Sequence, residues 1–153
     1  MLGLILVIFL FFRVTRVVGT SMEPSLADGQ RGLIMLNRFK VYTPSRYDVV
    51  LVKKGDEDKV LVKRVIGIPG DKVEIKENCI FINGTPMREE YVKEEMFTED
   101  LSIVLGEDEI FILGDNRNVS RDSRDPNIGA VKYKEEVLAK FILDLKDFSY
   151  IDI

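Results

Sequence analysis

The hydrophobic pattern beyond residue 18 consists of short apolar runs separated by charged or glycine-containing turns. Such runs span residues 32–36, 48–52 and 60–68 and are rich in the β-branched residues that favour strands. A charged tip around Gly55 lies between the second and third runs, and two apolar runs joined in this way predict a β-hairpin. This part of the chain therefore predicts strands and turns.

The same pattern continues towards the C-terminus. Polar and apolar residues alternate over 72–75, as in a half-buried strand, and Asn83-Gly84 is a strong signal for a type I′ turn. The polar segment 88–96 fits either a short helix or a loop. The chain shows no internal repeat, and we expect one mainly β domain of short strands. Further strands are predicted at the remaining apolar runs, 80–82, 102–105, 109–113 and 137–143.

The N-terminal segment differs from the rest because residues 1–12 carry no polar side chain. Twelve helical residues would cover about 18 Å, short of the roughly 30 Å hydrocarbon core of a bilayer. Arg13 and Arg16 follow and can extend their charges to the interface. We expect a membrane anchor over 1–18, shortened at its N-terminus, and a folded β-domain over 19–153. The alternatives are a buried strand or helix and a cleaved signal, which the missing basic start and Ala-x-Ala site disfavour.

Composition and charge narrow the possible functions. The 153 residues carry a net charge of −4, which argues against a nucleic-acid partner. Cys79 is the only cysteine and there is no histidine, so an intramolecular disulfide is excluded and a zinc site is disfavoured. Because Cys79 opens an apolar run, we expect it to be a buried structural thiol. No metal and no cofactor are expected.

The absence of histidine also restricts catalytic chemistry. A triad of serine, histidine and aspartate is impossible, so a serine nucleophile such as Ser21 would need another base, and lysine is the obvious one. Lys63 has Leu61 and Val65 on its own strand face, which points it towards an apolar environment. Desolvation lowers a lysine pKa, and a drop of about 2 units raises the neutral fraction about a hundredfold. The ordinary alternatives are a turn serine and a surface lysine.

A third segment, Gly114 to Arg124, follows a predicted apolar strand and is dense in hydrogen-bonding side chains. A solvated loop has this composition. A buried polar network also needs such a collection, because each buried polar group must find a partner.

Together these segments resemble the type I signal peptidases, which are Ser–Lys enzymes that remove signal peptides from exported proteins. Residues 21–26 (SMEPSL) resemble the family's nucleophile box, and residues 46–50 resemble the strand box that follows it, with Tyr47 where glycine is common. Residues 63–71 resemble the base box and 114–124 the final box. The four boxes occur in the family's order behind an apolar segment. The resemblance implies a signal-peptidase-like β-domain.

The resemblance also implies roles for individual residues. Ser21 is the expected nucleophile and Lys63 the expected general base, with Ser120 hydrogen-bonded to the lysine to orient it. The backbone N–H of Ser21 would supply one oxyanion donor, whereas Gly19 stands where some family members add a hydroxyl. Charged supporting residues are expected at Asp122, Arg124, Asp115 and Arg64, the last two paired with each other. The substrate would contact Val17, Gly19, Met22, Leu26 and Val62.

The expected partners are the signal peptides of exported preproteins and membrane lipid. By the resemblance, the protein is expected to be a single-pass cell-membrane enzyme with its catalytic domain on the extracytoplasmic face. Two alternatives remain at this point. One is another Ser–Lys processing peptidase, such as one that matures pilus or conjugation proteins. The other is a catalytically silent membrane-anchored binding module.

Overall fold

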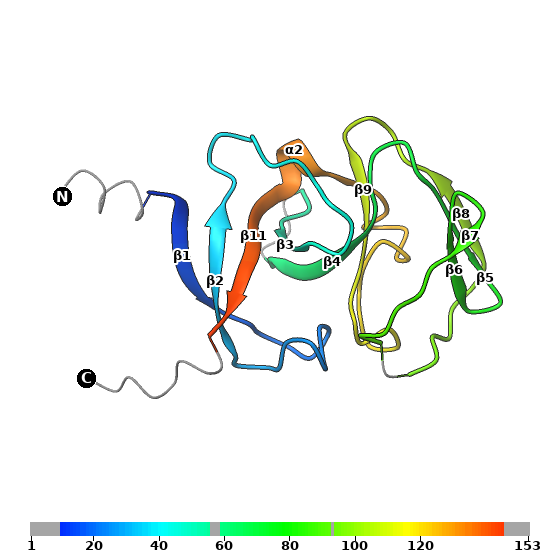
Figure 1. Cartoon of the computed structure of the whole chain (residues 1–153), viewed down its shortest axis with the longest axis horizontal. Coiled ribbons are helices and arrows are strands. Elements are labelled where there is room, and N and C mark those ends of the chain that lie inside the picture. Colours follow the sequence, from blue (N-terminus) through cyan, green and yellow to red (C-terminus); the bar gives the residue numbers. More distant parts are fainter. Residues whose placement is uncertain (1–9, 56–58, 93, 146–153) are drawn as a thin grey trace.

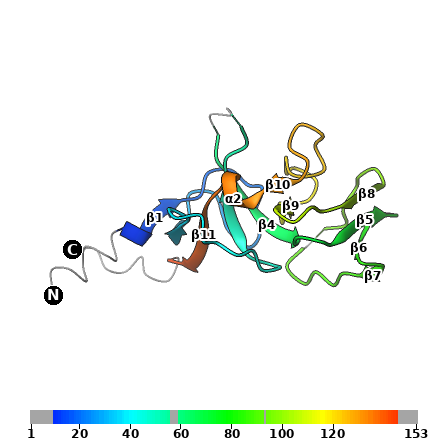
Figure 2. The same cartoon turned by 90° about the horizontal axis from the view of Figure 1, so that it is seen from above.

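The computed structural model describes residues 10–55, 59–92 and 94–145. Its architecture is mainly β, as predicted, with one large and one small antiparallel sheet at opposite ends of an elongated molecule (Figures 1 and 2). The large sheet has the strand order β1-β2-β11-β3-β4-β9-β10. Its strands are β1 (Phe12–Arg16), β2 (Arg31–Leu36), β3 (Val49–Val52), β4 (Leu61–Gly67), β9 (Glu109–Leu113), β10 (Val131–Lys132) and β11 (Val137–Asp144).

The small sheet has the order β7-β6-β5-β8. It is an insertion between β4 and β9, so the chain leaves the large sheet at the end of β4 and returns at the start of β9 (Figure 1). A single helical turn, α2 (Tyr133–Glu136), precedes β11 and was not predicted. The strands of the small sheet are β5 (Lys72–Lys76), β6 (Cys79–Ile82), β7 (Thr85–Pro86) and β8 (Leu101–Val104).

The predicted turns are confirmed. Strands β3 and β4 form the expected hairpin, with Val52 paired to Leu61. Asn83 and Gly84 both have positive φ, 53° and 80°, as a type I′ turn requires, and they join Ile82 to Thr85 across a two-residue turn. Within the described part of segment 88–96 there is no helix, so the loop alternative holds.

Two local predictions are wrong. Cys79 is exposed, because it is the first residue of β6 and its side chain faces away from the core that Ile80 enters. The strand over 72–75 is not simply half-buried, since Glu74 is buried with Val73 and Ile75. Lys72 and Lys76 compensate the Glu74 carboxylate at 3.0 and 2.7 Å, which accounts for a buried acid in an otherwise apolar strand.

The N-terminal segment also differs from the prediction. Phe12–Arg16 forms β1, which pairs along its whole length with β2, so this part of the predicted anchor over 1–18 belongs to the sheet. Residues 1–9 lie outside the described residues. Among the residues that the structure does describe, no helix is long and apolar enough to span a membrane.

Two apolar cores fix strand β4, and β4 carries the site described below. Val65 packs into the core beneath β3, β4 and β9, whereas Ile66 packs into the core shared with the small sheet. Both side chains are fully buried, so β4 is held from both faces.

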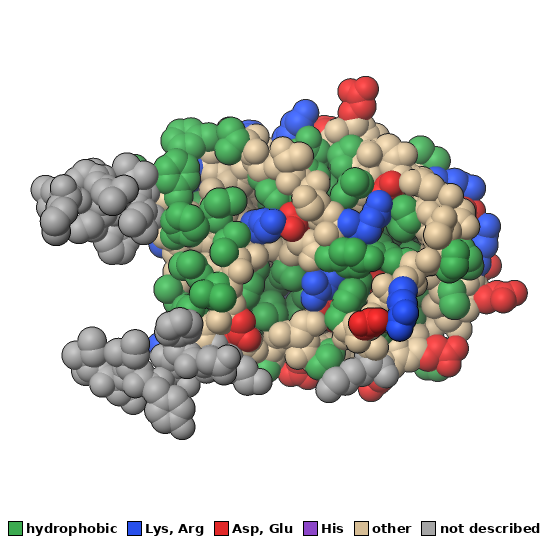
Figure 3. Space-filling view, in the orientation of Figure 1, with side chains coloured by type: hydrophobic (Ala, Val, Ile, Leu, Met, Phe, Trp, Pro, Cys, Tyr) green, Lys and Arg blue, Asp and Glu red, His purple; other side chains and the backbone are tan. Residues whose placement is uncertain are grey.

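The end of the molecule that carries β1, β2 and β11 exposes many hydrophobic side chains (Figure 3). They are spread over the edge strand, the β2–β3 connection and the end of β11. A hollow of about 340 Å³ lies among them, lined in part by Phe11, Phe39 and Val41. The strongly exposed members of this hydrophobic end are Leu10, Val14, Phe39, Val41, Ile142 and Leu143.

Candidate active site

Ser21 lies on the loop that connects β1 to β2, and the residues after it anchor that loop. Met22 and Leu26 are 1% and 5% exposed and pack with Val17, while the Leu26 N–H donates to the Met22 carbonyl oxygen at 2.9 Å. The Ser21 carbonyl oxygen accepts a hydrogen bond from the backbone N–H of Asn116 at 3.0 Å. The loop is therefore fixed by the burial of its apolar side chains and by a backbone hydrogen bond to the segment that follows β9.

Lys63 lies in β4 and is 3% exposed, which confirms that its side chain is directed inward. Its Nζ donates hydrogen bonds to Ser21 Oγ at 2.7 Å and to the Val62 carbonyl oxygen at 3.0 Å. The structure thus joins a serine and a lysine that are 42 positions apart in the chain. When the amine is neutral, the same contact reverses, and the serine O–H donates to the nitrogen lone pair.

The environment of Lys63 favours that neutral form. Burial lowers the pKa of Lys63 from 10.5 to about 8, against the opposing effects of the Asp122 and Asp115 carboxylates, while Arg124 lowers it further. At pH 7 about one lysine in ten would then be neutral, compared with about one in 2,500 for a free side chain. A buried base with a pKa near the working pH is well suited to proton transfer.

The predicted hydrogen bond from Ser120 to Lys63 is absent. The Lys63 donors are directed to Ser21 and Val62, and Ser120 Oγ is buried without a hydrogen-bond partner among the described residues. Ser120 instead lies against Gly114, where a Cβ atom would collide with its side chain. The residue is therefore beside the site, as expected, but its hydroxyl does not orient the lysine in this structure.

Asp122 and Arg124 support the loop that carries Ser120. The Asp122 carboxylate is completely buried and is paired with the Arg124 guanidinium, Nε to Oδ1 at 2.8 Å and Nη2 to Oδ2 at 2.9 Å. Its Oδ2 also accepts the Gly114 backbone N–H at 3.0 Å. A carboxylate that holds a backbone N–H and a two-pronged arginine fixes the geometry of the loop around it.

Arg64 and Asp115 form the predicted pair. Arg64 Nε and Nη2 donate to the two Asp115 oxygens at 2.8 and 2.6 Å, and the carboxylate is fully buried. Arg64 also donates to Ser25 Oγ at 3.3 Å and to the Tyr47 carbonyl oxygen at 3.0 Å. It therefore connects β4 with the loop of Ser21 and with the segment before β3. Tyr47 has φ of 72°, which explains why glycine suits this position.

The predicted substrate-contacting residues divide into two groups. Val17, Met22 and Leu26 form one apolar cluster, and Val62 of β4 packs against it. Gly19 is separate and exposed, with φ of 93° and nothing within 4 Å of the position where a side chain would begin. Its N–H donates to Asp28 Oδ1 at 2.8 Å. Among the described residues, the Ser21 N–H makes no hydrogen bond to the backbone.

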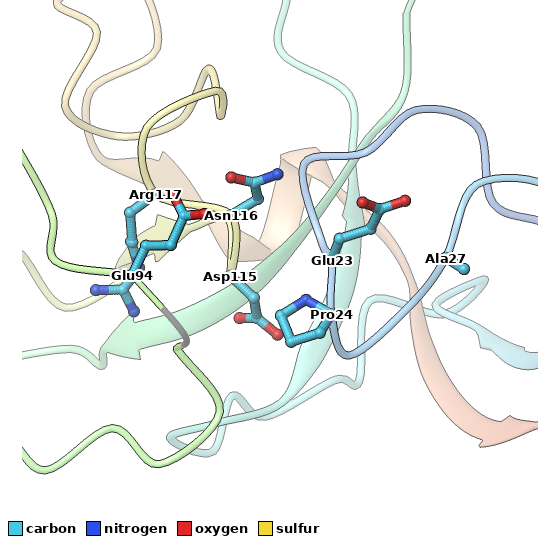
Figure 4. A pocket seen from close by; sticks show the side chains of 7 residues that line it. All are labelled: Glu23, Pro24, Ala27, Glu94, Asp115, Asn116 and Arg117. Atoms are coloured by element: carbon cyan, nitrogen blue, oxygen red, sulfur yellow. The ribbon is translucent and has the colours of Figure 1, made fainter.

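A pocket lies between the loop that carries Glu23 and Pro24 and the loop that carries Asp115 (Figure 4). Its volume is about 360 Å³. It directly adjoins the Ser21 loop. No three cysteine, aspartate or glutamate side chains of the described residues are placed to hold a metal ion. The pocket is lined by Glu23, Pro24, Ala27, Glu94, Asp115, Asn116 and Arg117.

Sequence reasoning missed several residues of the site. Asn116 and Gly114 lie in the segment noted for its polar composition, but their contacts with the Ser21 backbone depend on how two loops meet. Glu89 and Tyr91 fall in the polar stretch that had no assigned role. An aromatic residue within a charged loop was the one available signal for Tyr91.

A serine and a buried lysine brought together on a β scaffold define a hydrolase-like site, and comparisons with known proteins agree. The family model "Signal peptidase, peptidase S26" matches residues 1–143. Signal peptidase I P of Bacillus subtilis subsp. natto is 35% identical over 144 residues, covering 84% of this chain and 76% of that protein. Signal peptidase IB of Staphylococcus aureus (strain Mu50 / ATCC 700699) is 33% identical over 141 residues, covering 76% and 73%.

A solved structure gives the same result. The crystal structure of a signal peptidase I from Enterococcus faecalis V583 matches with a TM-score of 0.53 at 31% identity, covering 64% of this chain and 98% of that one. The chain is thus a serine endopeptidase of the class that removes signal peptides. It belongs to the signal peptidase family, peptidase S26.

Proposed function

We propose that this endopeptidase removes signal peptides through a dyad in which Ser21 is the nucleophile and Lys63 is the general base. The observation that carries the proposal is the 2.7 Å contact between a serine hydroxyl and a buried lysine whose pKa is lowered to about 8. The chain contains no histidine, the residue that most often serves as a general base near neutral pH, so the base in this site has to be another residue type.

The reaction follows from this contact. Neutral Lys63 takes the hydroxyl proton as Ser21 Oγ attacks the scissile carbonyl carbon. The tetrahedral oxyanion is stabilised by the Ser21 N–H. Lys63 then gives its proton to the leaving amine as the carbon–nitrogen bond breaks, which leaves an ester on Ser21. In the second half, Lys63 accepts a proton from water, water attacks the ester, and the proton returns to Ser21 Oγ as the carbon–oxygen bond breaks.

The substrate is proposed to bind as an extended strand beside Leu61–Lys63. Strand β9 pairs only with the later part of β4, starting at Arg64, so among the described strands one edge of β4 before Arg64 has no partner. An added strand there would bring its backbone alongside Lys63. The cluster of Val17, Met22 and Val62 lies nearby and favours small apolar side chains, because little space remains between such tightly packed residues.

A membrane location is proposed as well. Signal peptides are apolar, and confining enzyme and substrate to one bilayer raises their effective concentration. The hydrophobic end formed by β1, β2 and β11 fits an interface with lipid (Figure 3). We place the catalytic domain on the extracytoplasmic face, where exported preproteins emerge.

Cleavage of a preprotein with a small residue before the scissile bond tests the proposal. Wild-type protein in detergent should release the mature protein, and Ser21→Ala and Lys63→Ala should each abolish cleavage while remaining folded. Lys54→Ala is the matched control, since Lys54 is also partly buried but pairs with Glu136 at 3.2 Å. Full activity in either dyad variant would refute the mechanism. Folded wild-type protein that leaves several such preproteins intact would also contradict the proposal.

The choice of substrate distinguishes the proposed function from the remaining alternative, a Ser–Lys peptidase that matures pilus or conjugation proteins. A pilus or conjugation maturation enzyme would cleave its own class of precursor and leave ordinary secretory preproteins intact. The similarity to proteins described as signal peptidase I favours secretory preproteins.

A further inference from the structure

The side chain of Tyr91 lies on the guanidinium group of Arg64, the neighbour of Lys63 in β4. Arg64 Cζ is 4.3 Å from the centre of the Tyr91 ring. The ring also packs against Tyr47 in a T-shaped arrangement, with ring centres 6.1 Å apart at 76°. Tyr91 thus contacts both an aromatic ring and the Arg64 guanidinium, whose side chain is only 13% exposed.

Glu89 fixes this tyrosine to the rest of the site. The Tyr91 hydroxyl donates to Glu89 Oε1 at 2.6 Å, and burial raises the pKa of Tyr91, which keeps the donor protonated. Glu89 also accepts two hydrogen bonds from Arg117, at 2.7 and 2.6 Å, and the Arg117 side chain is 2% exposed. Arg117 Nε in turn donates to the Gly114 carbonyl oxygen at 3.0 Å.

Two chains of contacts start at Tyr91 and Glu89, and they lead to the two segments that carry Lys63 and Ser21. One runs from Tyr91 through Arg64 to strand β4, the strand of Lys63. The other runs from Glu89 through Arg117 to Gly114, which touches the Ser21 backbone. The two hydrogen bonds from a planar guanidinium to a carboxylate form only in one orientation of the guanidinium. An aromatic ring stacked on its face limits rotation of the guanidinium out of that orientation.

We propose that Tyr91, anchored by Glu89, is a positioning residue for the catalytic lysine, acting by holding the Arg64 guanidinium on Asp115. The proposal rests on the proposed Ser21–Lys63 mechanism. If Arg64 rotates away, the Asp115 charge is less neutralised and β4 loses its connections to Ser25 and Tyr47. An Asp115 carboxylate with less compensation favours the protonated lysine.

Among the described residues, the charged groups that act most on the pKa of Lys63 come from the segment after β9. Asp122 and Asp115 favour the protonated lysine and Arg124 disfavours it. Tyr91 contacts neither Asp122 nor Arg124 in any interaction of the described residues. The cations that face its ring are Arg64 and, at 6.0 Å, Arg117, so its replacement should act on Lys63 chiefly through the closer Arg64 and its partner Asp115.

The test measures the pH dependence of kcat/KM and the Lys63 pKa in Tyr91→Leu and Tyr91→Phe proteins. Tyr91→Leu should move the acidic limb up by about half a pH unit or more, which is about a threefold loss of neutral lysine at pH 7. Tyr91→Phe retains the ring on Arg64 but loses the hydrogen bond to Glu89, so it should move the limb in the same direction by less than Tyr91→Leu does. In an Arg64→Lys background, Tyr91→Leu should add little, because both changes disrupt one pair.

Tyr133→Leu is the matched control. Tyr133 is also half-buried, meets Tyr42 in a T-shaped arrangement at 6.4 Å and has the Lys134 ammonium 5.7 Å from its ring centre, but no interaction of the described residues joins it to Arg64. Its replacement should lower stability without moving the limb. If Tyr91→Leu does not fold, Tyr91→Met replaces it with a flexible side chain of similar volume.

A titration that needs no turnover separates this inference from the proposed function. Lys63 can be followed by NMR in full-length protein labelled with carbon-13 lysine, and assigned with Lys63→Ala. An upward shift in folded Tyr91→Leu, with Tyr133→Leu unchanged, supports the positioning role. An unchanged Lys63 pKa and an unchanged kcat/KM profile in Tyr91→Leu would overturn it. Inactive wild-type protein would refute the proposed function alone, because the titration still reports on Tyr91.

Discussion

A Cβ atom on Gly114 would lie 2.5 Å from the carbonyl oxygen of Ser21. The glycine therefore allows the loop after β9 to pack directly on the backbone of the nucleophile. The same Cβ atom would also collide with the side chain of Ser120. This close approach places the final polar segment and the serine loop in one site.

Gly114→Ala should strongly reduce kcat, by about tenfold or more, because the added methyl group would collide with both the Ser21 carbonyl oxygen and the Ser120 side chain. Cleavage kinetics with thermal unfolding measure the effect. Gly106→Ala is the control, since its Cβ would meet only the flexible Glu109 side chain, at 3.3 Å. Equal activity of both variants would show that the Gly114 contact is unimportant.

Lys63 should reduce stability below pH 8. Because the pKa of Lys63 is lower in the folded state, the unfolded chain binds the proton more strongly between about pH 8 and 10.5, and wild-type stability rises with pH in that window. Lys63→Met should therefore be more stable than wild type at pH 6, by up to about 3 kcal/mol, and the difference should shrink by pH 10.

Denaturant unfolding of wild type and Lys63→Met at several pH values measures that difference. Lys54→Met serves as the comparison, because Lys54 gains a partner in Glu136 and its loss should not stabilise the protein. A constant difference between wild type and Lys63→Met from pH 6 to 10 would contradict a lowered pKa.

Asp122→Asn should produce two opposite effects. The acidic limb of kcat/KM should move to lower pH, because Asp122 raises the pKa of Lys63 and the Arg124 charge that it pairs with acts in the lowering direction. The maximal rate should fall about tenfold, since an amide oxygen cannot replace both carboxylate interactions with Arg124 and Gly114.

Asp125→Asn tests whether that shift is specific. Asp125 lies in the same loop and pairs with Arg121 at 2.8 Å near the surface. Its replacement should leave the limb unchanged. If Asp125→Asn moved the acidic limb as far as Asp122→Asn does, the effect would come from the total charge of the loop. The position of Asp122 beside Lys63 would then not matter.

Much of the fold could be predicted because its strands carry clear local patterns. The hairpin of β3 and β4 and the Asn83-Gly84 turn depend on neighbouring residues, and both are confirmed. Strand β1 was hidden by its apolar context, since Phe12 continues a run that also suits a membrane segment. Its identity as a strand depends on pairing with β2, which lies further along the chain, so the residues next to β1 could not predict it.

The site was predictable to the extent that it follows motifs. Ser21, Lys63 and the Arg64–Asp115 pair lie where the resemblance placed them. The missing Ser120–Lys63 hydrogen bond depends on side-chain rotamers, which no motif specifies. Tyr91 acts through a stack between segments far apart in sequence, and such a contact leaves no periodic signal.

The pH dependence of kcat/KM for preprotein cleavage tests the central claim most directly, because it reports the ionisation of the free enzyme. The account predicts an acidic limb with an apparent pKa near 8, the value expected for buried Lys63, and loss of cleavage at all pH values in Lys63→Ala. An acidic limb near the free-lysine value of about 10.4, or a wild-type profile in Lys63→Ala, would contradict it.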